Sequence, residues 1–389
     1  MKRHAFVRWF AGTVWVAVTL LSASTPSSIA AGPPSVYVAD WGAWYKHPPP
    51  EEFERQGSLY RLSLDGSNHV SSRTRVGDIG LAPVGIDVSA DGRWVLVSAR
   101  NSSDLRIFDM KGPPGSPVAH CKLTGQPYGI ALVERPKSPL VIVAATDGIL
   151  WAPFAGAQTC RKLRAVDGTE PAGRWALSLP AMIAVSPSKR TAYVTDYRSN
   201  GLLEIDLTTP SPTVRRPIEI SGAGNGLTVG PDGRYLYVPI HNRNVLQIVD
   251  LSCESFRPSC YRELPTEDYP ISTAVSRDGR HVFVVNNRIS ALPGNTRKPG
   301  SLTVISTGPT LEAHQTVSLV SPVVFGDSPE GITIQPCTGE LFVTHRDDPK
   351  GWLLILKFDA NKRSFSHLRI ENMGRAGAQS RFIQSNCSK

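Results

Sequence analysis

The stretch NGLTVGPDGRYLYVPIHNRNVLQIVDL, residues 225–251, contains the pattern from which most of the chain is built. Three runs with alternating apolar side chains lie at residues 226–229, 235–239 and 245–251, and their Val, Tyr, Leu and Ile residues suit half-buried strands. The Asp232-Gly233 dipeptide supplies the left-handed backbone conformation that a short hairpin turn needs. The stretch therefore predicts three consecutive antiparallel strands.

The same unit recurs along the whole chain. Its first strands are expected to begin near Gly85, Gly129, Met182, Gly226, Ser272 and Gly331. Most of these positions are about 45 residues apart, which is the period of a four-stranded propeller blade. A fourth apolar run follows each unit and is expected to form the outer strand of the blade.

The two ends of the chain complete the repeat. Strands of the second and third type at residues 35–40 and 57–66 lack a first strand before them, whereas residues 381–387 (RFIQSNC) align with the first-strand segment 331–337 (GITIQPC). The pattern thus predicts an all-β, seven-bladed β-propeller that is closed by the C-terminal strand pairing into the N-terminal blade. Closure leaves only short, protected strand edges.

The units resemble the YVTN family of β-propeller repeats. The resemblance lies in the second strands, TAYVTDY (191–197), YLYVPIH (235–241), HVFVVNN (281–287) and ELFVTHR (340–346), and in the S-x-D-G-R turns at 89–93 and 276–280. It covers nearly all of the mature chain. It implies the propeller fold and a group that includes lactonase-type hydrolases, surface-layer proteins and periplasmic proteins. It implies no catalytic residue, because these motifs form hairpins.

The first thirty residues have the pattern of a secretory signal peptide. A basic start precedes an apolar run at residues 9–23, and Ser28-Ile29-Ala30 is a small-x-small cleavage pattern. The alternative is a membrane anchor, but the apolar run is shorter than the ~20 residues of a spanning helix. We therefore predict a signal peptide at 1–30, a propeller at 31–389, and a periplasmic or secreted location.

The charge of the chain is moderately positive. Loss of Lys2, Arg3 and Arg8 with the signal peptide lowers the formal net charge of +9 by three units. Such a charge is compatible with anionic ligands but does not indicate a nucleic-acid binder. We expect a small-molecule or protein ligand at one face, no nucleic acid and no transmembrane anchor. The pattern does not determine the oligomeric state.

The six cysteines of an exported chain are expected to form disulfides rather than metal sites. Cys253 and Cys260 flank a short loop that a disulfide readily closes. Cys337 and Cys387 occupy equivalent first-turn positions in the last blade and in the blade that the C-terminus completes. A bridge between them would restrain the closing strand and stabilise the fold.

The pairing of Cys121 and Cys160 stays open at this point. Both are expected on the outer strands of neighbouring blades, so they either form a disulfide by elimination or remain as two buried thiols. Outer strands fan apart, and Cα atoms more than ~7 Å apart cannot be bridged.

One face of the predicted propeller carries the candidate site. Loops from second to third strands and loops into the next blade share that face, and function usually lies on such loops. An arginine follows the second strand in five blades: Arg100, Arg198, Arg243, Arg288 and Arg346. Guanidinium groups match carboxylates and phosphates, so this set predicts an anionic ligand. The alternative is that these arginines are solvated hairpin tips.

Two long loops are expected on adjacent blades at the same face. The loop at residues 41–56 supplies Trp41, Trp44, Tyr45 and His47, and a second long loop spans residues 288–299. Aromatic side chains beside a few polar groups are the usual lining of a ligand pocket. The alternative is a proline-rich cap that packs its tryptophans for stability.

For catalysis, His345 beside Asp347, with His241 or Glu330 across the channel, is the most plausible general-base or metal constellation. The chain contains no GxSxG, HExxH, Walker or dinucleotide-binding motif. We predict no cofactor, apart from a divalent metal if the catalytic hypothesis holds. The favoured function is an exported binding scaffold for an anionic small molecule, saccharide or protein. The alternatives are a lactonase-like hydrolase at the channel mouth and a structural envelope protein.

Overall fold

In a computed structural model of the chain, the described residues are 35–40, 56–67, 69–135, 138–253, 257–287, 300–320, 329–345, 351–374 and 377–383. Backbone contacts divide the chain into residues 1–32 and 33–389, and the described residues all belong to the second unit. The predicted signal peptide lies outside them. Within the described ranges, no helix is long and apolar enough to cross a membrane.

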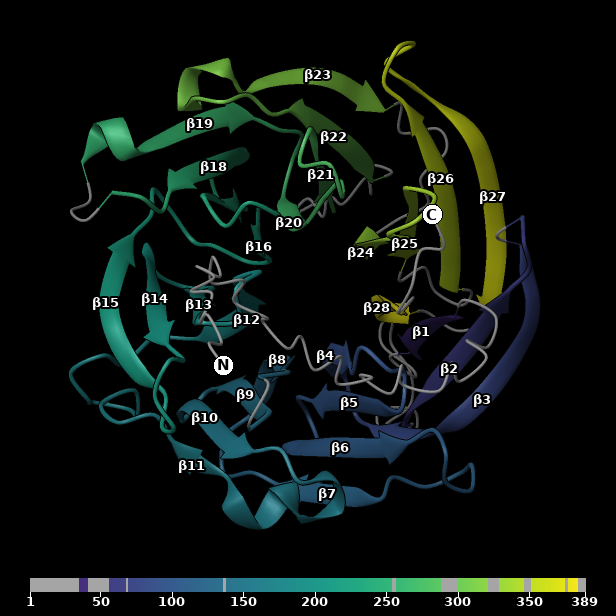
Figure 1. Cartoon of the computed structure of the whole chain (residues 1–389), viewed down its shortest axis with the longest axis vertical. Helices are drawn as coiled ribbons and strands as arrows, with labels where there is room; N and C mark the ends of the chain where they lie inside the picture. The colour runs from purple at the N-terminus through teal and green to yellow at the C-terminus, as the bar shows by residue number, and fades with distance from the viewer. Residues whose placement is uncertain are drawn as a thin grey trace, which may run out of the picture. The chain divides into compact units, whose positions relative to one another are not determined.

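The second unit is a seven-bladed β-propeller, with seven four-stranded antiparallel sheets around a central axis (Figure 1). From inner to outer strand, the first three blades are β28 (Gly377–Ile383), β1 (Ser35–Asp40), β2 (Gly57–Leu64) and β3 (Val70–Gly80); β4 (Pro83–Val88), β5 (Trp94–Ala99), β6 (Asp104–Asp109) and β7 (Ala119–Lys122); and β8 (Pro127–Val133), β9 (Leu140–Ala145), β10 (Gly148–Pro153) and β11 (Arg164–Ala165).

The other four blades follow the same order. They are β12 (Pro180–Val185), β13 (Thr191–Asp196), β14 (Gly201–Asp206) and β15 (Thr213–Glu219); β16 (Thr228–Val229), β17 (Tyr235–Ile240), β18 (Val245–Asp250) and β19 (Tyr261–Pro265); β20 (Pro270–Val275), β21 (His281–Asn286), β22 (Ser301–Ser306) and β23 (Gln315–Val320); and β24 (Pro329–Ile334), β25 (Glu340–His345), β26 (Gly351–Asp359) and β27 (Ser364–Gly374).

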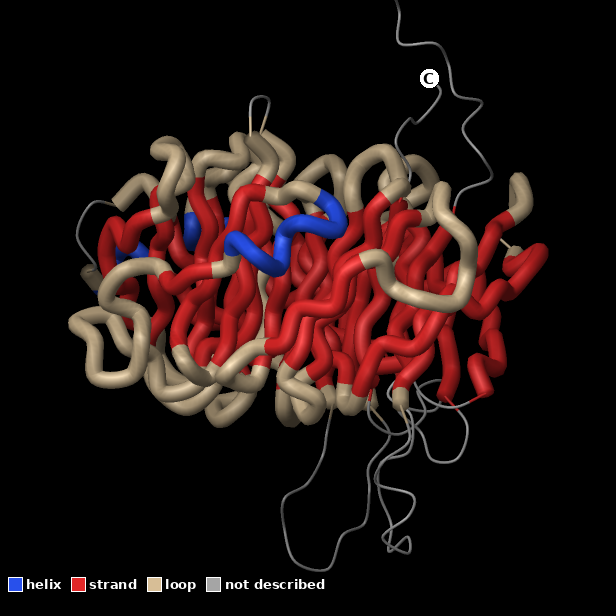
Figure 2. Tube along the Cα trace, turned by 90° about the horizontal axis from the view of Figure 1, so that it is seen from below, coloured by secondary structure: helices blue, strands red, loops and turns tan. Residues whose placement is uncertain are grey.

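Three short 3₁₀ helices complete the described structure: η2 (Gly156–Lys162), η3 (Pro258–Cys260) and η4 (Leu311–Ala313). Seen from the side, the strands run between two faces, and loops gather at both of them (Figure 2). This arrangement separates the loops into two sets, and each set forms one face of the propeller.

The core of the propeller consists of layers between neighbouring blades. In β17 all six residues are buried, because the strand lies between two other sheets. Leu236 and Val238 pack with Tyr193 of the preceding blade, whereas Tyr237 packs with Val284 of the following one. Side chains that alternate between the two faces of a strand thus fill both layers. This explains why the second strands are almost entirely apolar in sequence.

The Asp-Gly turn in the opening stretch forms as expected. Gly233 has a φ of +75°, and its N–H donates to the oxygen of Gly230 over 2.9 Å. The carboxylate of Asp232 accepts the backbone N–H of Arg234 over 3.0 Å. Glycine is favoured at this position, because a residue with a Cβ would be strained in the left-handed conformation.

The inner strand of the same blade is shorter than the pattern predicts. We expected a strand at 226–229, but β16 contains only Thr228 and Val229. Gly226 instead donates its N–H to the oxygen of Ile271 in the neighbouring blade over 2.8 Å. A Cβ on Gly226 would lie 2.6 Å from that oxygen, so this contact between blades requires glycine.

The strands β1 and β28 belong to the same sheet. β28 pairs antiparallel with β1, where Phe382 lies opposite Val36 and Ser380 lies opposite Val38. On its other side β1 pairs with β2 (Figure 1). The N-terminal strand is therefore hydrogen-bonded on both sides and does not form an open edge.

One expected disulfide is confirmed, and the pairing that the sequence left open is a disulfide as well. Cys253 and Cys260 are bonded, with their Cα atoms 6.0 Å apart. Cys121 and Cys160 are bonded as well, with a Cα separation of 4.9 Å. The expected position of Cys160 on an outer strand is wrong, because it lies in η2, whose turn brings it beside β7.

Cys337 is also disulfide-bonded. Its expected partner, Cys387, lies outside the described residues. Among the described cysteines none is free.

Candidate functional site

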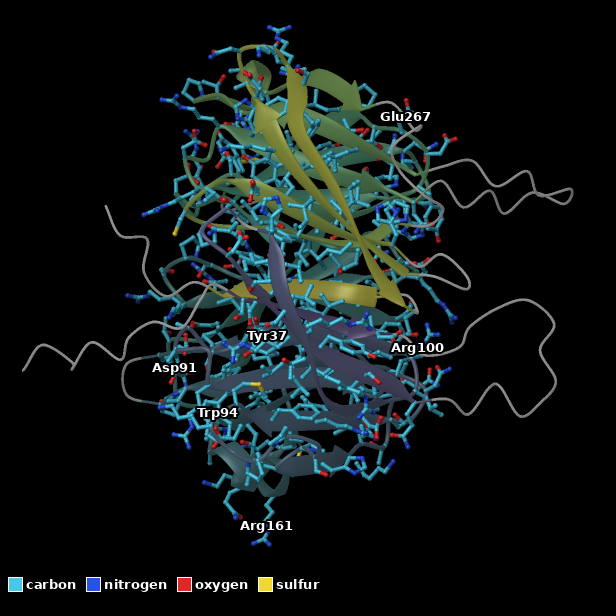
Figure 3. All side chains as sticks on the ribbon, turned by 90° about the vertical axis from the view of Figure 1, so that its right-hand side faces the viewer. Tyr37, Asp91, Trp94, Arg100, Arg161 and Glu267 are labelled. Carbon is cyan, nitrogen blue, oxygen red and sulfur yellow. A yellow bond between two sulfur atoms is a disulfide. The ribbon has the colours of Figure 1, made fainter. Side chains whose placement is uncertain are left out.

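The loops that follow second strands and the loops that lead into the next blade share one face of the propeller. Figure 3 shows Arg100, from a loop of the first kind, and Glu267, from a loop of the second kind, on the same side. Asp91, from the turn between a first and a second strand, and Trp94, at the start of that second strand, lie on the opposite side. We call the side of Arg100 and Glu267 the mouth face.

Three aromatic side chains from three successive blades meet at the mouth face. Tyr197 follows β13, His241 follows β17 and Tyr269 precedes β20. The ring of His241 stacks on Tyr197, with 4.4 Å between centroids and 17° between planes, and its centroid is 5.0 Å from that of Tyr269. The two tyrosine hydroxyls are hydrogen-bonded to each other. We refer to these residues as the aromatic triad.

The position of Tyr197 depends on the residue before it. Asp196 is buried, and its carboxylate accepts the backbone N–H groups of Ser178, Leu179 and Arg198 over 2.6, 3.0 and 2.8 Å. These bonds fix the loop after β13 to the loop before β12. A buried carboxylate of this kind is satisfied by backbone donors rather than by surface arginines.

Tyr269 is held in an unusual backbone conformation. Its φ is +59°, a region that bulky residues rarely occupy. Its backbone N–H donates to Oδ1 of Asn244 over 2.9 Å, and its backbone carbonyl oxygen accepts the backbone N–H of Asn287 over 2.9 Å. Residues held this way cluster at functional sites, because surrounding contacts must offset the strain.

His241 is the least satisfied member of the triad. It is 9% exposed, and its Nδ1 is buried with no hydrogen-bond partner in the described part of the chain. Burial lowers the pKa of its imidazole, although a backbone contact with Ala223 acts in the opposite direction. The ring is therefore neutral near neutral pH, and its Nδ1 is a buried polar atom without a partner among the described residues.

A carboxylate and a third tyrosine flank the triad. Burial raises the pKa of Tyr197, as does its hydrogen bond with Tyr269, and the nearby Glu330 and Tyr128 raise it further. Nδ2 of Asn287 approaches Oε1 of Glu330 to 3.5 Å. The phenol of Tyr197 thus stays protonated, and Glu330 supplies a carboxylate close to it.

One arginine joins this group. The guanidinium of Arg100 lies 5.7 Å from the ring centroid of Tyr128, within the range of a cation–π contact. The residues of the triad together with Tyr128, Glu330 and Arg100 are called the mouth cluster below. It contains aromatic faces, one cation, one carboxylate and phenol donors.

The other predicted arginines have different surroundings. Arg243 donates to Glu263 of the outer strand β19 over 2.8 Å and to the oxygen of Ser221 over 3.3 Å. Arg198 is exposed. Arg288 and Arg346 lie outside the described residues. Of the three described members of this set, Arg100 is the one with a cation–π contact to an aromatic ring of the mouth cluster.

The predicted catalytic residues are partly described. His345 is buried at the end of β25, where its backbone lies opposite Pro329, the residue before Glu330. Asp347 and the aromatic loop residues Trp41, Trp44, Tyr45 and His47 lie outside the described residues. Within the described ranges, no group of three or more His, Cys, Asp or Glu side chains is arranged to hold a metal ion.

The sequence analysis did not single out Tyr128, Tyr197 and Tyr269. Each of them stands within two residues of a strand end on the mouth face, in the segments PYGI, YVTDY and YPIST. A search for aromatic residues at these repeat positions would have found them. Their meeting depends on the curvature of the ring, which brings loops of several blades together.

Comparison with known proteins supports the fold. No family model matches the chain. The seven-bladed beta-propeller protein Rv1057 of Mycobacterium tuberculosis is 29% identical over 143 residues, which is 36% of this chain and 33% of that protein. The match thus spans about a third of the length of the curated relative.

Solved structures match over most of the chain. The periplasmic gluconolactonase PpgL of Pseudomonas aeruginosa has a TM-score of 0.64 at 14% identity, with 91% of this chain and 99% of that chain covered. A protein from Lactobacillus plantarum has a TM-score of 0.65 at 15% identity, with 90% and 99% covered. At such identities the similarity establishes the seven-bladed propeller fold, which lactonase-like proteins share.

Proposed function

We propose that the mouth cluster binds a small sugar acid or the lactone formed from it. The observation that carries this proposal is His241, whose Nδ1 is buried without a partner inside an aromatic cluster. A buried polar atom without a hydrogen bond costs about 1–3 kcal/mol. A ligand hydroxyl that reaches this nitrogen offsets that cost.

The remaining groups of the cluster suit the same ligand class. The hydroxyl groups of Tyr197 and Tyr269 and the carboxylate of Glu330 offer hydrogen bonds to sugar hydroxyls. Arg100 offers a bidentate partner for a carboxylate. The aromatic rings provide apolar faces for the C–H groups of a sugar ring, in keeping with the usual lining of small-molecule sites.

We further infer that β28 closes the ring and that the chain acts outside the cytoplasm. The first inference is supported by the pairing of β28 with β1, and the second by the disulfides, which persist in oxidising compartments. The similarity in fold to a periplasmic gluconolactonase is consistent with this location.

The binding proposal is tested by calorimetric titration of the purified protein with gluconate and with glucono-δ-lactone. Tyr197→Phe removes one hydroxyl and should weaken binding about tenfold, as should Arg100→Ala. Arg243→Ala is the matched control, because this arginine is engaged by Glu263. If neither compound binds, or if Arg243→Ala weakens binding as much as Arg100→Ala does, the proposal is wrong.

Lactone hydrolysis is the second candidate function. It is favoured by the proximity of Glu330 and of the neutral His241 to the protonated phenol of Tyr197. Either base would take a proton from water as the water oxygen attacks the lactone carbonyl, and the phenol would donate a hydrogen bond to the developing oxyanion. As the intermediate collapses, the C–O bond to the ring oxygen breaks, and the protonated base returns its proton to that oxygen, which leaves as the alcohol of the hydroxy acid.

A pH-stat assay with glucono-δ-lactone separates the two functions. Hydrolysis predicts a rate above the spontaneous one, and it predicts that Glu330→Gln lowers this rate by about 10²-fold or more. A rate equal to the spontaneous one would reject hydrolysis of this lactone and leave the binding proposal standing.

A further inference from the structure

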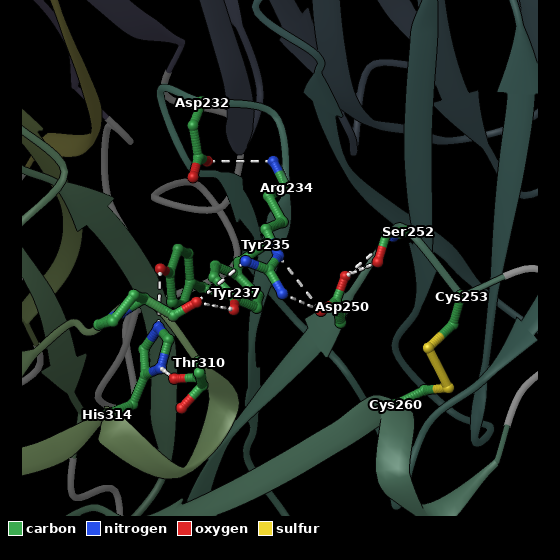
Figure 4. A network of polar contacts seen from close by, with 11 residues as sticks. Asp232, Arg234, Tyr235, Tyr237, Asp250, Ser252, Cys253, Cys260, Thr310 and His314 are labelled. Atoms are coloured by element: carbon green, nitrogen blue, oxygen red, sulfur yellow. Dashed lines mark hydrogen bonds and ion pairs between the residues drawn. A yellow bond between two sulfur atoms is a disulfide. The ribbon is translucent and has the colours of Figure 1, made fainter.

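The face opposite the mouth has a feature that differs between blades. In two blades an arginine at the end of the first hairpin turn pairs with an aspartate on the third strand. Arg93 donates to Asp109 over 3.0 and 2.8 Å, and Arg234 approaches Asp250 over 3.3 and 3.1 Å (Figure 4). In both blades the residue after the arginine lies opposite the aspartate in the strand register.

The last blade replaces both members of this pair. Gly339 occupies the position of the arginine, and Lys357 occupies that of the aspartate, since Glu340 lies opposite Lys357 in the register. No heavy atom lies within 4 Å of a Cβ built on Gly339, so the side of this turn is open. Where two other blades have an arginine and an aspartate, this blade has a glycine and a lysine.

A cavity of about 540 Å³ occupies this place between the last two blades. Pockets for small molecules typically measure about 300–1,000 Å³, so the volume suits a ligand of one or two rings. Aromatic side chains form part of its wall. The ring centroid of Phe358 lies 5.1 Å from that of His281 and 5.6 Å from that of Phe283, and both pairs are in edge-to-face contact. Phe358 and His281 are half-buried, which leaves ring atoms accessible from the cavity.

The polar lining is positive. Arg277 and Lys357 contribute two cations from exposed positions. The carboxylate of Asp278 contributes one negative charge, and it is engaged by the hydroxyl of Ser276 over 2.6 Å and the N–H of Arg280 over 3.0 Å. Burial lowers the pKa of His281, which is therefore uncharged near neutral pH. The two cations and one carboxylate leave a net charge of one positive unit.

The wall of the cavity is held in place by the turn that contains Gly339. The side-chain oxygen of Gln335 accepts the N–H groups of Cys337 and Thr338, and the backbone oxygen of Gln335 accepts the N–H of Gly339 over 2.9 Å. Cys337 is further constrained by its disulfide. A wall fixed in the absence of ligand reduces the entropy that binding would cost.

We propose that this cavity is a second binding site, which takes an aromatic monocarboxylate. The ring packs against Phe358 and His281, and the carboxylate lies between Lys357 and Arg277. The site is independent of the mouth cluster, because it lies on the opposite face of the propeller. Its wall contains Gly339 and Lys357 at the positions that the arginine and the aspartate occupy in the two blades described above.

The test is a calorimetric titration with 2-naphthoate and with its uncharged analogue 2-naphthalenemethanol. We expect one molecule of naphthoate to bind per chain and the alcohol to bind about tenfold more weakly, because a hydrogen bond to a charged group is lost. Lys357→Met should weaken naphthoate binding to a similar extent, whereas Lys357→Arg should preserve it. Arg190→Ala, an exposed arginine in the corresponding turn of another blade, serves as the control.

Several outcomes would overturn the proposal. The proposal is wrong if naphthoate does not bind, if the acid and the alcohol bind equally well, or if Lys357→Met binds naphthoate as tightly as the unaltered protein does. It is also wrong if excess gluconate displaces naphthoate, because naphthoate would then bind at the mouth. Lys357 is exposed, so its substitution is expected to leave the fold intact, and circular dichroism checks this for each variant.

Discussion

Replacement of Asp196 by alanine tests how the mouth face is held together. The carboxylate accepts four hydrogen bonds, from the N–H groups of Ser178, Leu179 and Arg198 and from the hydroxyl of Ser199. Arg198 and Ser199 can turn to water when the carboxylate is removed, whereas the N–H of Leu179 is buried and stays unsatisfied. Each hydrogen bond to a charged group contributes about 1.5–3 kcal/mol. We therefore expect a loss of about 3–5 kcal/mol in the free energy of unfolding, comparable to breaking a buried ion pair.

The same substitution should affect the site, because Tyr197 follows Asp196 directly. The assay is urea unfolding, followed by circular dichroism, together with titration of gluconate. Asp206→Ala is the control on the same blade, since its carboxylate serves only Thr208 among the hydrogen bonds described, and its loss should cost less than about 1 kcal/mol. If Asp196→Ala destabilises the protein no more than the control does, the carboxylate does not organise these loops.

Three further predictions concern the disulfide, the pH dependence and the closing strand. Substitution of Cys121 and Cys160 by serine opens a loop of 39 residues and should lower the stability by about 4 kcal/mol in the chain-entropy model, measured as a lower melting temperature. Burial lowers the pKa of His241 and His314, so the unfolded chain binds more protons below the pKa of an exposed histidine, about 6.5. The free energy of unfolding should therefore keep its full value above that pH and fall as the pH decreases below it. His241→Phe should make this decrease with pH less steep. A urea midpoint that does not change between about pH 7 and pH 5 would contradict this prediction. Deletion of residues 377–389 removes the partner of β1 and should cause aggregation or a large loss of melting temperature, whereas a fully stable truncated protein would show that β28 does not close the ring.

Much of the fold was predictable from local pattern. The Asp232-Gly233 turn and the apolar runs around it each depend on residues close in sequence, and both form as expected. The errors arise where neighbouring blades meet. The strand β16 is short because Gly226 bonds to the next blade, and Cys160 lies in a 3₁₀ helix whose turn carries it to β7.

The candidate site was predictable only in part. Arg100, predicted from its repeat position, and His241 and Glu330, predicted as catalytic candidates across the channel, all belong to the mouth cluster, but their predicted roles stay predictions. Tyr197 and Tyr269 are 72 residues apart, and their hydrogen bond requires three blades in sequence around the ring. The pairing of Arg243 with Glu263 likewise depends on the packing of one strand against another.

The amino-acid sequence alone determined the repeat, the number of blades and the face on which the loops gather, because alternation of side chains and Asp-Gly turns are local properties of the backbone. Only the tertiary structure decided which side chains meet: the aromatic triad at the mouth and the cavity beside Gly339 on the other face. The physical reason is that these groups come from different blades, and their distances are set by the packing of sheets around the axis rather than by spacing along the chain.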